Sequence, residues 1–181
     1  MTHLRNLLVM LVCLLPIEAC RLCAQTAAAK DPWAPLQFLV GTWIGEGSGE
    51  PGPSGTGGST FFFKLDKQIL VRNNWAKYPP RPGEKTGISH EDLMIIYPDS
   101  SGAAMRAIYF DNESHVIHYV ASFPALQSVT FESDASQPGP RYRLTYDLGS
   151  DGKLVIAFFI AAPGQPFKEY TRGLARRAEN R

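Results

Sequence analysis

The feature that most constrains the fold of this chain is a succession of short strand-like segments that opens at Gly41-Thr42-Trp43 and runs to Arg177. The tripeptide follows a short apolar lead-in at 33–40. No convincing helical periodicity interrupts the segments after it, and alternating apolar and polar residues recur within them. This pattern favours an all-β fold of a single domain.

The predicted strands are rich in β-branched and aromatic residues and are separated by Gly, Pro, Asn, Asp and Ser. They lie at 42–49, 60–65, 68–75, 90–97, 104–110, 116–123, 128–132, 141–147, 153–161 and 167–175. About ten strands with mostly short connections indicate an antiparallel up-and-down meander. Closing it into a β-barrel removes the edges that an open sheet exposes. Residues 35–40 are expected to form one short helical turn at the barrel mouth.

Alternation within the strands predicts one buried face. Tyr142, Leu144 and Tyr146 share a face, and the same holds for the even-numbered residues of 154–160. The pattern does not say which face lines the lumen. The segment 50–58 is rich in Gly, Pro and Ser but has no phosphate-binding motif, so we expect a flexible loop there.

The first residues have the order of a secretory signal peptide, with a positive charge at Arg5, an apolar run at 7–15 and small residues after it. The apolar run has about nine residues, against the roughly 20 that span a bilayer, so no transmembrane helix is expected. We therefore expect a signal peptide at 1–24, a tether at 25–32 and a barrel domain at 33–178, in a secreted or periplasmic protein.

The three cysteines, Cys13, Cys20 and Cys23, all lie in or beside this leader. Cleavage after Ala24 leaves a mature chain with neither a disulfide nor a thiol nucleophile. The alternative is a lipid anchor at Cys20, because residues 17–20 resemble a bacterial lipoprotein box. The full chain carries a net charge of +1, and removing the leader leaves it near neutral. A near-neutral surface argues against nucleic acid as the partner.

Several motifs resemble known proteins. Residues 38–47 look like the opening of the nitrobindin family, ten-stranded barrels in the lipocalin-like (calycin) group, and His90-Glu91-Asp92 and residues 173–177 are similar to two further motifs of that family. The chain is also similar to bacterial secreted proteins of lipocalin-like type to which no activity is firmly attached. The resemblance implies a barrel in which Gly41 and Trp43 plug one end. An arginine of the last strand, here Arg172 or Arg176, is then expected to stack on the indole.

Nitrobindins bind haem through a histidine on the last strand, and the iron handles nitric oxide and peroxynitrite. In this chain the matching position is Tyr170, and no histidine follows His118. The resemblance therefore implies haem only if a tyrosinate holds the iron. No other cofactor is expected.

The candidate ligand-binding residues are few. His90 and Asp92 share one strand face, which suits a base and its orienting group, two metal ligands, or a polar strand start. His118 has Val116 and Val120 as same-face neighbours and is interpreted as a polar group in an apolar lumen. The remaining candidates are Tyr109, Tyr119 and Tyr170.

His115 and His118 are three residues apart, and this spacing on a strand sends their side chains to opposite faces. No zinc site is therefore predicted. The leading hypothesis is a binding module, not an enzyme, that takes a small apolar or amphipathic molecule into its lumen. The alternatives are a nitrobindin-like haem protein and a structural or interaction domain without a cavity.

Overall fold

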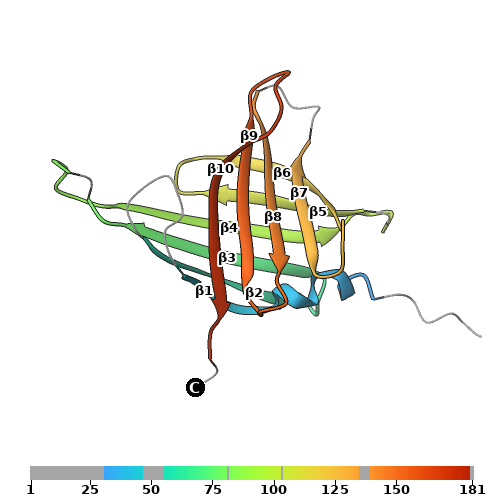
Figure 1. Ribbon diagram of the computed structural model, residues 1–181. Helices are drawn as coiled ribbons and strands as arrows, with labels where there is room; N and C mark the ends of the chain where they lie inside the picture. The colour runs from blue at the N-terminus through green and yellow to red at the C-terminus, as the bar shows by residue number, and fades with distance from the viewer. Residues whose placement is uncertain (1–30, 47–54, 81, 103, 135–138, 180–181) are drawn as a thin grey trace, which may run out of the picture. The chain divides into compact units, whose positions relative to one another are not determined.

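The computed structural model describes residues 31–46, 55–80, 82–102, 104–134 and 139–179, and within them the chain forms one short helix and ten strands (Figure 1). The elements are η1 (Ala34–Leu39), β1 (Gly41–Glu46), β2 (Thr56–Lys64), β3 (Ile69–Tyr78), β4 (Ile88–Pro98), β5 (Met105–Asp111), β6 (Val116–Ser122), β7 (Ser128–Ser133), β8 (Arg141–Leu148), β9 (Leu154–Ala161) and β10 (Lys168–Arg177). The predicted all-β fold with about ten strands and one helical turn is confirmed.

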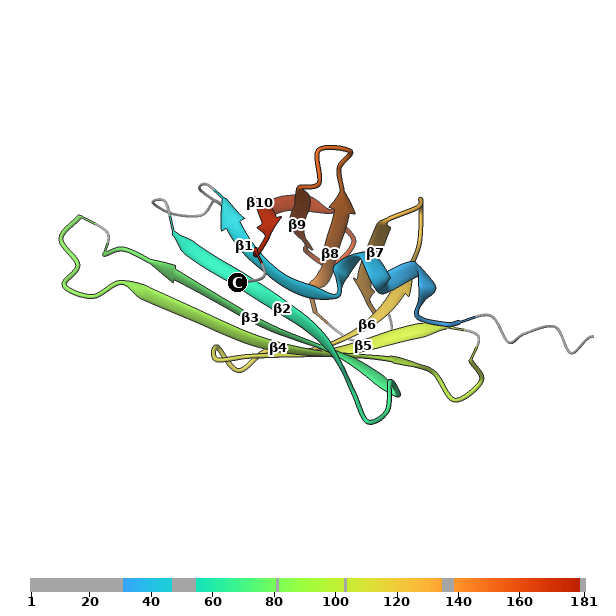
Figure 2. The ribbon, with the colours of Figure 1, turned by 90° about the horizontal axis from the view of Figure 1, so that it is seen from below.

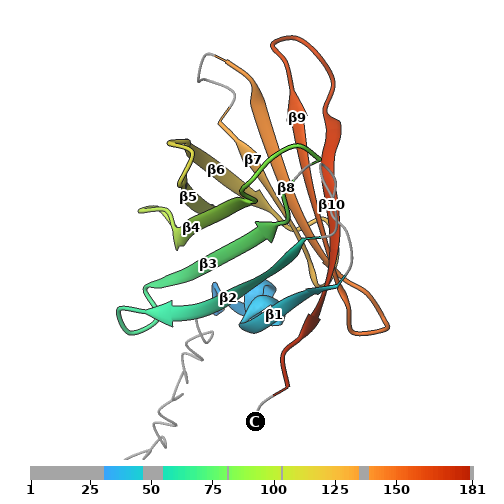
Figure 3. The ribbon, with the colours of Figure 1, turned by 90° about the vertical axis from the view of Figure 1, so that its left-hand side faces the viewer.

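The strands form a closed antiparallel barrel in which each strand pairs with its neighbours in sequence order (Figures 2 and 3). β1 closes the barrel because it pairs on one side with β2, where Gly41 lies opposite Phe61, and on the other with β10, where Trp43 lies opposite Arg177. Closure leaves no unpaired edge in the barrel. The up-and-down topology predicted from the short connections is therefore the observed one.

The hairpin between β2 and β3 turns at the predicted residues. Asp66 and Lys67 both have positive φ, 51° and 63°, and the amide of Gln68 donates to the carbonyl of Leu65 at 2.9 Å. Leu65 also has a positive φ, 51°, so three consecutive left-handed residues reverse the chain between the paired residues Lys64 and Ile69.

Strand β2 begins at Thr56, earlier than predicted, so part of the expected loop at 50–58 belongs to the barrel. Residues 50–54 of that loop and residues 47–49 of the predicted first strand lie outside the described residues. A Cβ at Gly57 would lie 2.9 Å from the carbonyl oxygen of Trp75, and one at Gly58 would lie 2.7 Å from that of Trp43. These glycines therefore allow close approach of neighbouring backbone within a strand and do not mark a flexible loop.

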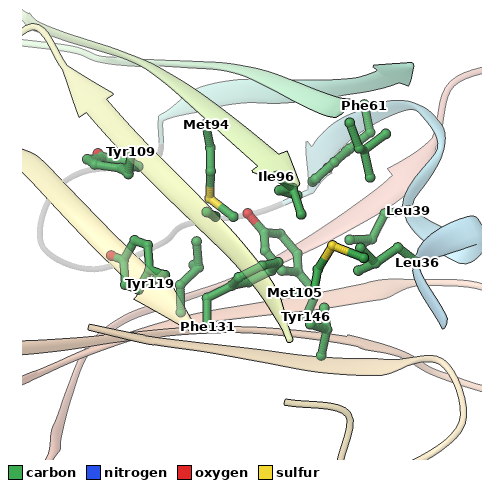
Figure 4. Packing of buried hydrophobic residues seen from close by; sticks show 14 of the residues in the cluster. Leu36, Leu39, Phe61, Met94, Ile96, Met105, Tyr109, Tyr119, Phe131 and Tyr146 are labelled. Atoms are coloured by element: carbon green, nitrogen blue, oxygen red, sulfur yellow. The ribbon is translucent and has the colours of Figure 1, made fainter. Parts of the chain in front are cut away.

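The helical turn η1 and the apolar core fill one end of the barrel, which we call the closed end. Leu36 and Leu39 of η1 are fully buried, and Trp33 packs edge-on against Phe63 with ring centroids 5.2 Å apart. In Figure 4, Leu36 and Leu39 lie at one side of the buried cluster and Tyr109 and Tyr119 at the other. Contacts between η1 and β7 hold the turn to the barrel wall.

Trp43 plugs the closed end. Its side chain is 1% exposed and its Nε1 donates to the carbonyl of Leu39 at 2.8 Å. The guanidinium over this indole is that of Arg177, 4.4 Å from the ring. It donates to the carbonyls of Val40 and Phe38 at 2.6 and 2.8 Å. One basic side chain thus joins the last strand to the backbone before β1.

The expected stacking partners, Arg172 and Arg176, are elsewhere. Arg172 pairs with Glu169 at 2.6 Å and Arg176 with Glu46 at 3.2 Å, both with exposed guanidinium groups. The correction follows from the register, because Arg177 is the residue of β10 directly opposite Trp43.

The predicted signal peptide at 1–24, with Cys20, lies outside the described residues, as does the tether up to residue 30. In the described part of the chain, no helix has the length and apolar character to cross a membrane.

Candidate functional site

A cavity of about 680 Å³ occupies the barrel on the side away from η1. Its rim residues lie where β1, β3 and β5 end and where β4 begins, such as Glu46, Tyr78, Asp111 and Ile88. The structure also shows which strand face lines the lumen. It is the face that alternation groups together on β8 and β9, because six of its residues border the cavity: Tyr142, Leu144, Tyr146, Ile156, Phe158 and Ile160.

The cavity has two chemically different walls. Strands β3, β4 and β5 supply Arg72, Asn74, His90, Asp92 and Tyr109. The opposite wall, from β6, β8 and β9, is mainly apolar. It includes Ile117, Leu144, Ile156, Phe158 and Ile160. A pocket with an apolar body and a few polar groups at one side is typical of small-molecule sites.

Arg72 and Asp92 form a buried ion pair beneath the cavity. The Nη2 group of Arg72 donates to Asp92 Oδ1, and its Nη1 donates to the hydroxyl of Tyr146. Asn74 Nδ2 donates to the second carboxylate oxygen of Asp92 at 2.8 Å. Arg72 and Asp92 are 5% and 8% exposed. We call Arg72, Tyr119 and Tyr146 the cavity floor, because these three polar residues are buried and border the cavity, as Trp43 of the closed end also does.

Burial and pairing have opposite effects on the pKa values of Arg72 and Asp92. Burial disfavours both charges, but the Arg72 guanidinium, with His90 and Asn74, holds the pKa of Asp92 below its usual range. The pKa of Arg72 is raised, because the nearby Asp92 and tyrosine side chains outweigh the cost of burial. Both groups are therefore charged at neutral pH.

His90 lies between two carboxylates at the edge of the polar wall. Its Nε2 is 3.3 Å from Asp92 Oδ2, and its Nδ1 is 2.9 Å from Glu113 Oε1. The hydrogen bond to Asp92, with a smaller effect of Glu113, raises the pKa of His90 to about 9 against the cost of burial. His90 is therefore an imidazolium at neutral pH, with no free nitrogen lone pair for a metal ion or for proton abstraction.

A second histidine–carboxylate pair builds the turn between β5 and β6. Asp111 Oδ1 accepts from the amides of Glu113 and His115, and its Oδ2 is 2.9 Å from His115 Nδ1. Burial raises the pKa of Asp111, but these hydrogen bonds outweigh it and the net pKa is lowered. Tyr109 joins the two pairs, with its hydroxyl 3.2 Å from both His90 Nε2 and Asp111 Oδ2.

Two polar atoms at the cavity floor have no partner. Among the described residues, the Nε of Arg72 and the hydroxyl of Tyr119 are the only buried side-chain nitrogen or oxygen atoms that make no hydrogen bond. Burying such a group without a partner costs about 1–3 kcal/mol. Both residues border the cavity.

The structure brings together His90, Asp92, Tyr109 and Tyr119, four of the candidate residues, at the cavity. Tyr170 lies at the rim in a bulge of β10, with its side chain 51% exposed and its ring edge-on to Phe158 at 6.2 Å.

The interpretation of His118 as a luminal residue is wrong. On β6, Ile117 and Tyr119 are buried and border the cavity, whereas His118 is exposed on the outer face. Its neighbours Val116 and Val120 are exposed with it, at 57% and 37%. Alternation correctly groups these residues on one face, but apolar neighbours do not guarantee that the face is the inner one.

Sequence reasoning missed Arg72, Asn74 and Tyr146 as members of the site. A signal was present for Arg72, because this cationic residue directly follows the β-forming run 69–71 inside the predicted strand at 68–75 and shares the face of Leu70 by the two-residue period. Leu70 is fully buried, so that face is the inner one.

The described residues at the cavity are not arranged as the ligands of a metal ion. Within the described ranges, no group of three or more His, Cys, Asp or Glu side chains is arranged to hold a metal ion. The arrangement can instead bind: an apolar wall can cover hydrocarbon, and the floor offers two hydrogen-bond donors of fixed position.

The closed ten-stranded antiparallel barrel is compatible with a calycin-like fold. Comparison with protein-family models finds no match to this chain, and neither does a search of curated proteins.

Proposed function

We propose that this protein is a β-barrel binding module that takes a small apolar or amphipathic molecule into its lumen. The observation that carries the proposal is the cavity of about 680 Å³ between an apolar wall and a polar wall. This volume falls within the range of roughly 300–1,000 Å³ typical of ligand pockets. A barrel packed solid to its axis, as a purely structural domain would have, lacks such a space.

The position of Gly173 provides a direct test. It borders the cavity, and a Cβ there would have no atom within 4 Å. Gly173→Leu therefore places a side chain in the lumen at a position where its Cβ meets no other atom, and should change the free energy of unfolding by no more than about 1 kcal/mol. Arg172→Leu adds the same side chain one residue earlier, on the outer face, and serves as the matched control.

The measurement is binding of N-phenyl-1-naphthylamine, a neutral apolar dye whose fluorescence rises on burial. We expect the native protein and Arg172→Leu to bind the dye, and Gly173→Leu to bind it at least about tenfold more weakly. Absence of dye binding to the native protein, or equal binding to all three proteins, would contradict a luminal binding site.

A nitrobindin-like haem protein acting on nitric oxide or peroxynitrite is the alternative function, and the residues present do not fit it. An axial ligand must offer a free lone pair inside the cavity. His90 has a carboxylate at each ring nitrogen, and His115 and Tyr170 lie at the rim with half-exposed side chains. A Soret absorption band in the purified protein that weakens in Tyr170→Phe would support the alternative.

We also propose that the mature protein acts outside the cytoplasm, with the leader at 1–24 removed. What supports this is the signal-peptide order of charged, apolar and small residues. Mass measurement of the mature chain tests it: a new N-terminus between Ala19 and Ala29 supports secretion, and a diacylglycerol adduct on Cys20 supports a lipid anchor. An intact chain beginning at Met1 would contradict both.

A further inference from the structure

Two hydrogen-bond donors at the cavity floor are buried away from water and have no acceptor within the protein. Arg72 and Tyr119 are 5% and 2% exposed, and the Nε of the first and the hydroxyl of the second have no partner. Buried polar groups are normally hydrogen-bonded, so each exception calls for an explanation. Both residues border the cavity, but the two atoms themselves are covered by neighbouring protein atoms, so a bound molecule that displaces these neighbours can supply the missing acceptor.

Both donors are held in place by the surrounding structure. The two Nη groups of Arg72 each donate a hydrogen bond, to Tyr146 and to Asp92, whereas Nε donates none. The ring of Tyr119 packs edge-on against Tyr109 and Phe131, with centroid distances of 6.4 Å to each. Burial raises the pKa of Tyr119, so the hydroxyl keeps its proton and remains a donor. Preorganised donors bind an acceptor at a lower entropic cost than mobile ones.

The charges around the floor argue against an anionic acceptor. Arg72 is already paired with Asp92, and His90 lies between Asp92 and Glu113. Asp111 adds a third carboxylate to the cavity lining. A ligand carboxylate would be a further negative charge beside these groups, whereas a neutral carbonyl oxygen accepts hydrogen bonds without adding charge.

The apolar wall determines where the rest of the ligand lies. Ile156, Phe158 and Ile160 of β9 all border the cavity. These side chains offer a continuous apolar surface for a hydrocarbon chain, and burying that chain is favourable by about 25 cal/mol per Å².

We propose that the ligand is a neutral amphipathic molecule, such as a ketone, ester or lactone, whose carbonyl oxygen points to the cavity floor. It accepts hydrogen bonds from Arg72 Nε and from the Tyr119 hydroxyl, and its hydrocarbon part lies along the β9 wall. This inference rests on the proposed luminal binding function and adds to it the chemical class and the orientation of the ligand.

Three molecules built on the same eleven-carbon chain test the class by displacing N-phenyl-1-naphthylamine from the native protein. They are a methyl ketone, the alkene in which a methylene group replaces the ketone oxygen, and the straight-chain carboxylate. We expect the ketone to bind about tenfold more tightly than the alkene, because two hydrogen bonds together contribute about that much. The carboxylate should bind more weakly than the ketone.

Two variants test the floor residues. Tyr119→Phe removes only a hydroxyl that the protein does not use, so the variant should be at least as stable as the native protein. It should lower ketone affinity about fivefold and leave alkene affinity unchanged. Arg72→Lys keeps a charge for Asp92 but has no Nε donor, and it should act on the ketone in the same way.

The possible outcomes separate this inference from the function on which it rests. Equal affinity for ketone and alkene, tightest binding of the carboxylate, or no change of ketone affinity in either variant would overturn the inference while dye binding still supports a luminal site. Failure of the dye and of all three molecules to bind would overturn the luminal site and the inference together.

Discussion

The two ends of the barrel use the same strands for different purposes. At the closed end, Trp43, Leu36 and Leu39 are at most 1% exposed and pack against η1. At the other end, the interior holds the Arg72–Asp92 pair, His90 and a cavity. The difference indicates that apolar packing at one end holds the barrel together, while the other end can keep a space because it does not need to be filled for stability.

The polar wall is held by a different kind of interaction. Each fully buried leucine at the closed end contributes roughly 1.5–3 kcal/mol through the hydrophobic effect. The buried ion pair at the cavity loses hydration on both partners, and its attraction about compensates that loss. The clearer effect of the ion pair is on geometry, because it fixes the position of the Arg72 guanidinium, whose Nε makes no hydrogen bond. The two ends should therefore respond differently to truncation, to charge removal and to pH.

Truncating the tryptophan at each end gives the largest expected contrast. Trp43→Ala removes a buried indole, its hydrogen bond to Leu39 and its contact with Arg177, and should lower the free energy of unfolding by about 3–5 kcal/mol. Trp75→Ala at the cavity end, where the side chain is 41% exposed, should cost no more than about 1.5 kcal/mol. Urea unfolding measures both. Equal losses would contradict the assignment of stability to the closed end.

Removing one charge of the buried pair comes next in size. Asp92→Asn keeps the shape of the side chain but leaves the Arg72 guanidinium without its counter-charge, so we expect a loss of about 3 kcal/mol. Glu169→Gln is the matched control, because it removes the exposed partner of Arg172 and should leave the free energy of unfolding nearly unchanged. A loss at Asp92 no larger than at Glu169 would mean that the pair is not buried in solution.

Removing Arg177, the arginine over the Trp43 indole, should have a smaller effect on the free energy of unfolding, and it tests which arginine stabilises the closed end. Arg177→Ala removes two hydrogen bonds to the backbone and the stacking on Trp43, and should cost about 2 kcal/mol. Arg172→Ala, on the same strand, should cost less than about 1 kcal/mol. Thermal unfolding and the near-ultraviolet circular dichroism of the tryptophans distinguish them. A larger loss of stability in Arg172→Ala than in Arg177→Ala would instead support Arg172, as expected from the sequence, as the arginine that stacks on Trp43.

The pH dependence of stability should come from the cavity end. The pKa of His90 is raised from 6.5 to about 9 in the folded protein, so its contribution is fully present below pH 6.5 and is lost as pH rises through about 9. The free energy of unfolding should therefore fall between these values. His90→Gln should flatten that part of the profile, whereas Arg177→Ala should shift the whole profile without flattening it.

Local sequence features determined much of this protein. Ten strands, the Asp66-Lys67 turn, the short turn at the N-terminal side and the all-β class could be predicted, because turn residues and the two-residue period act between neighbours in the chain. The proximity of His90 and Asp92 could also be predicted, because residues two apart on a strand share a face.

The tertiary structure decided what depends on contacts between distant residues. Alternation groups Val116, His118 and Val120 on one face, but only barrel closure shows that this face is the outer one. Register alone places Arg177 opposite Trp43. The unpartnered atoms of Arg72 and Tyr119 are likewise visible only once the barrel has closed around them, because whether a polar atom finds a partner depends on every strand that surrounds it.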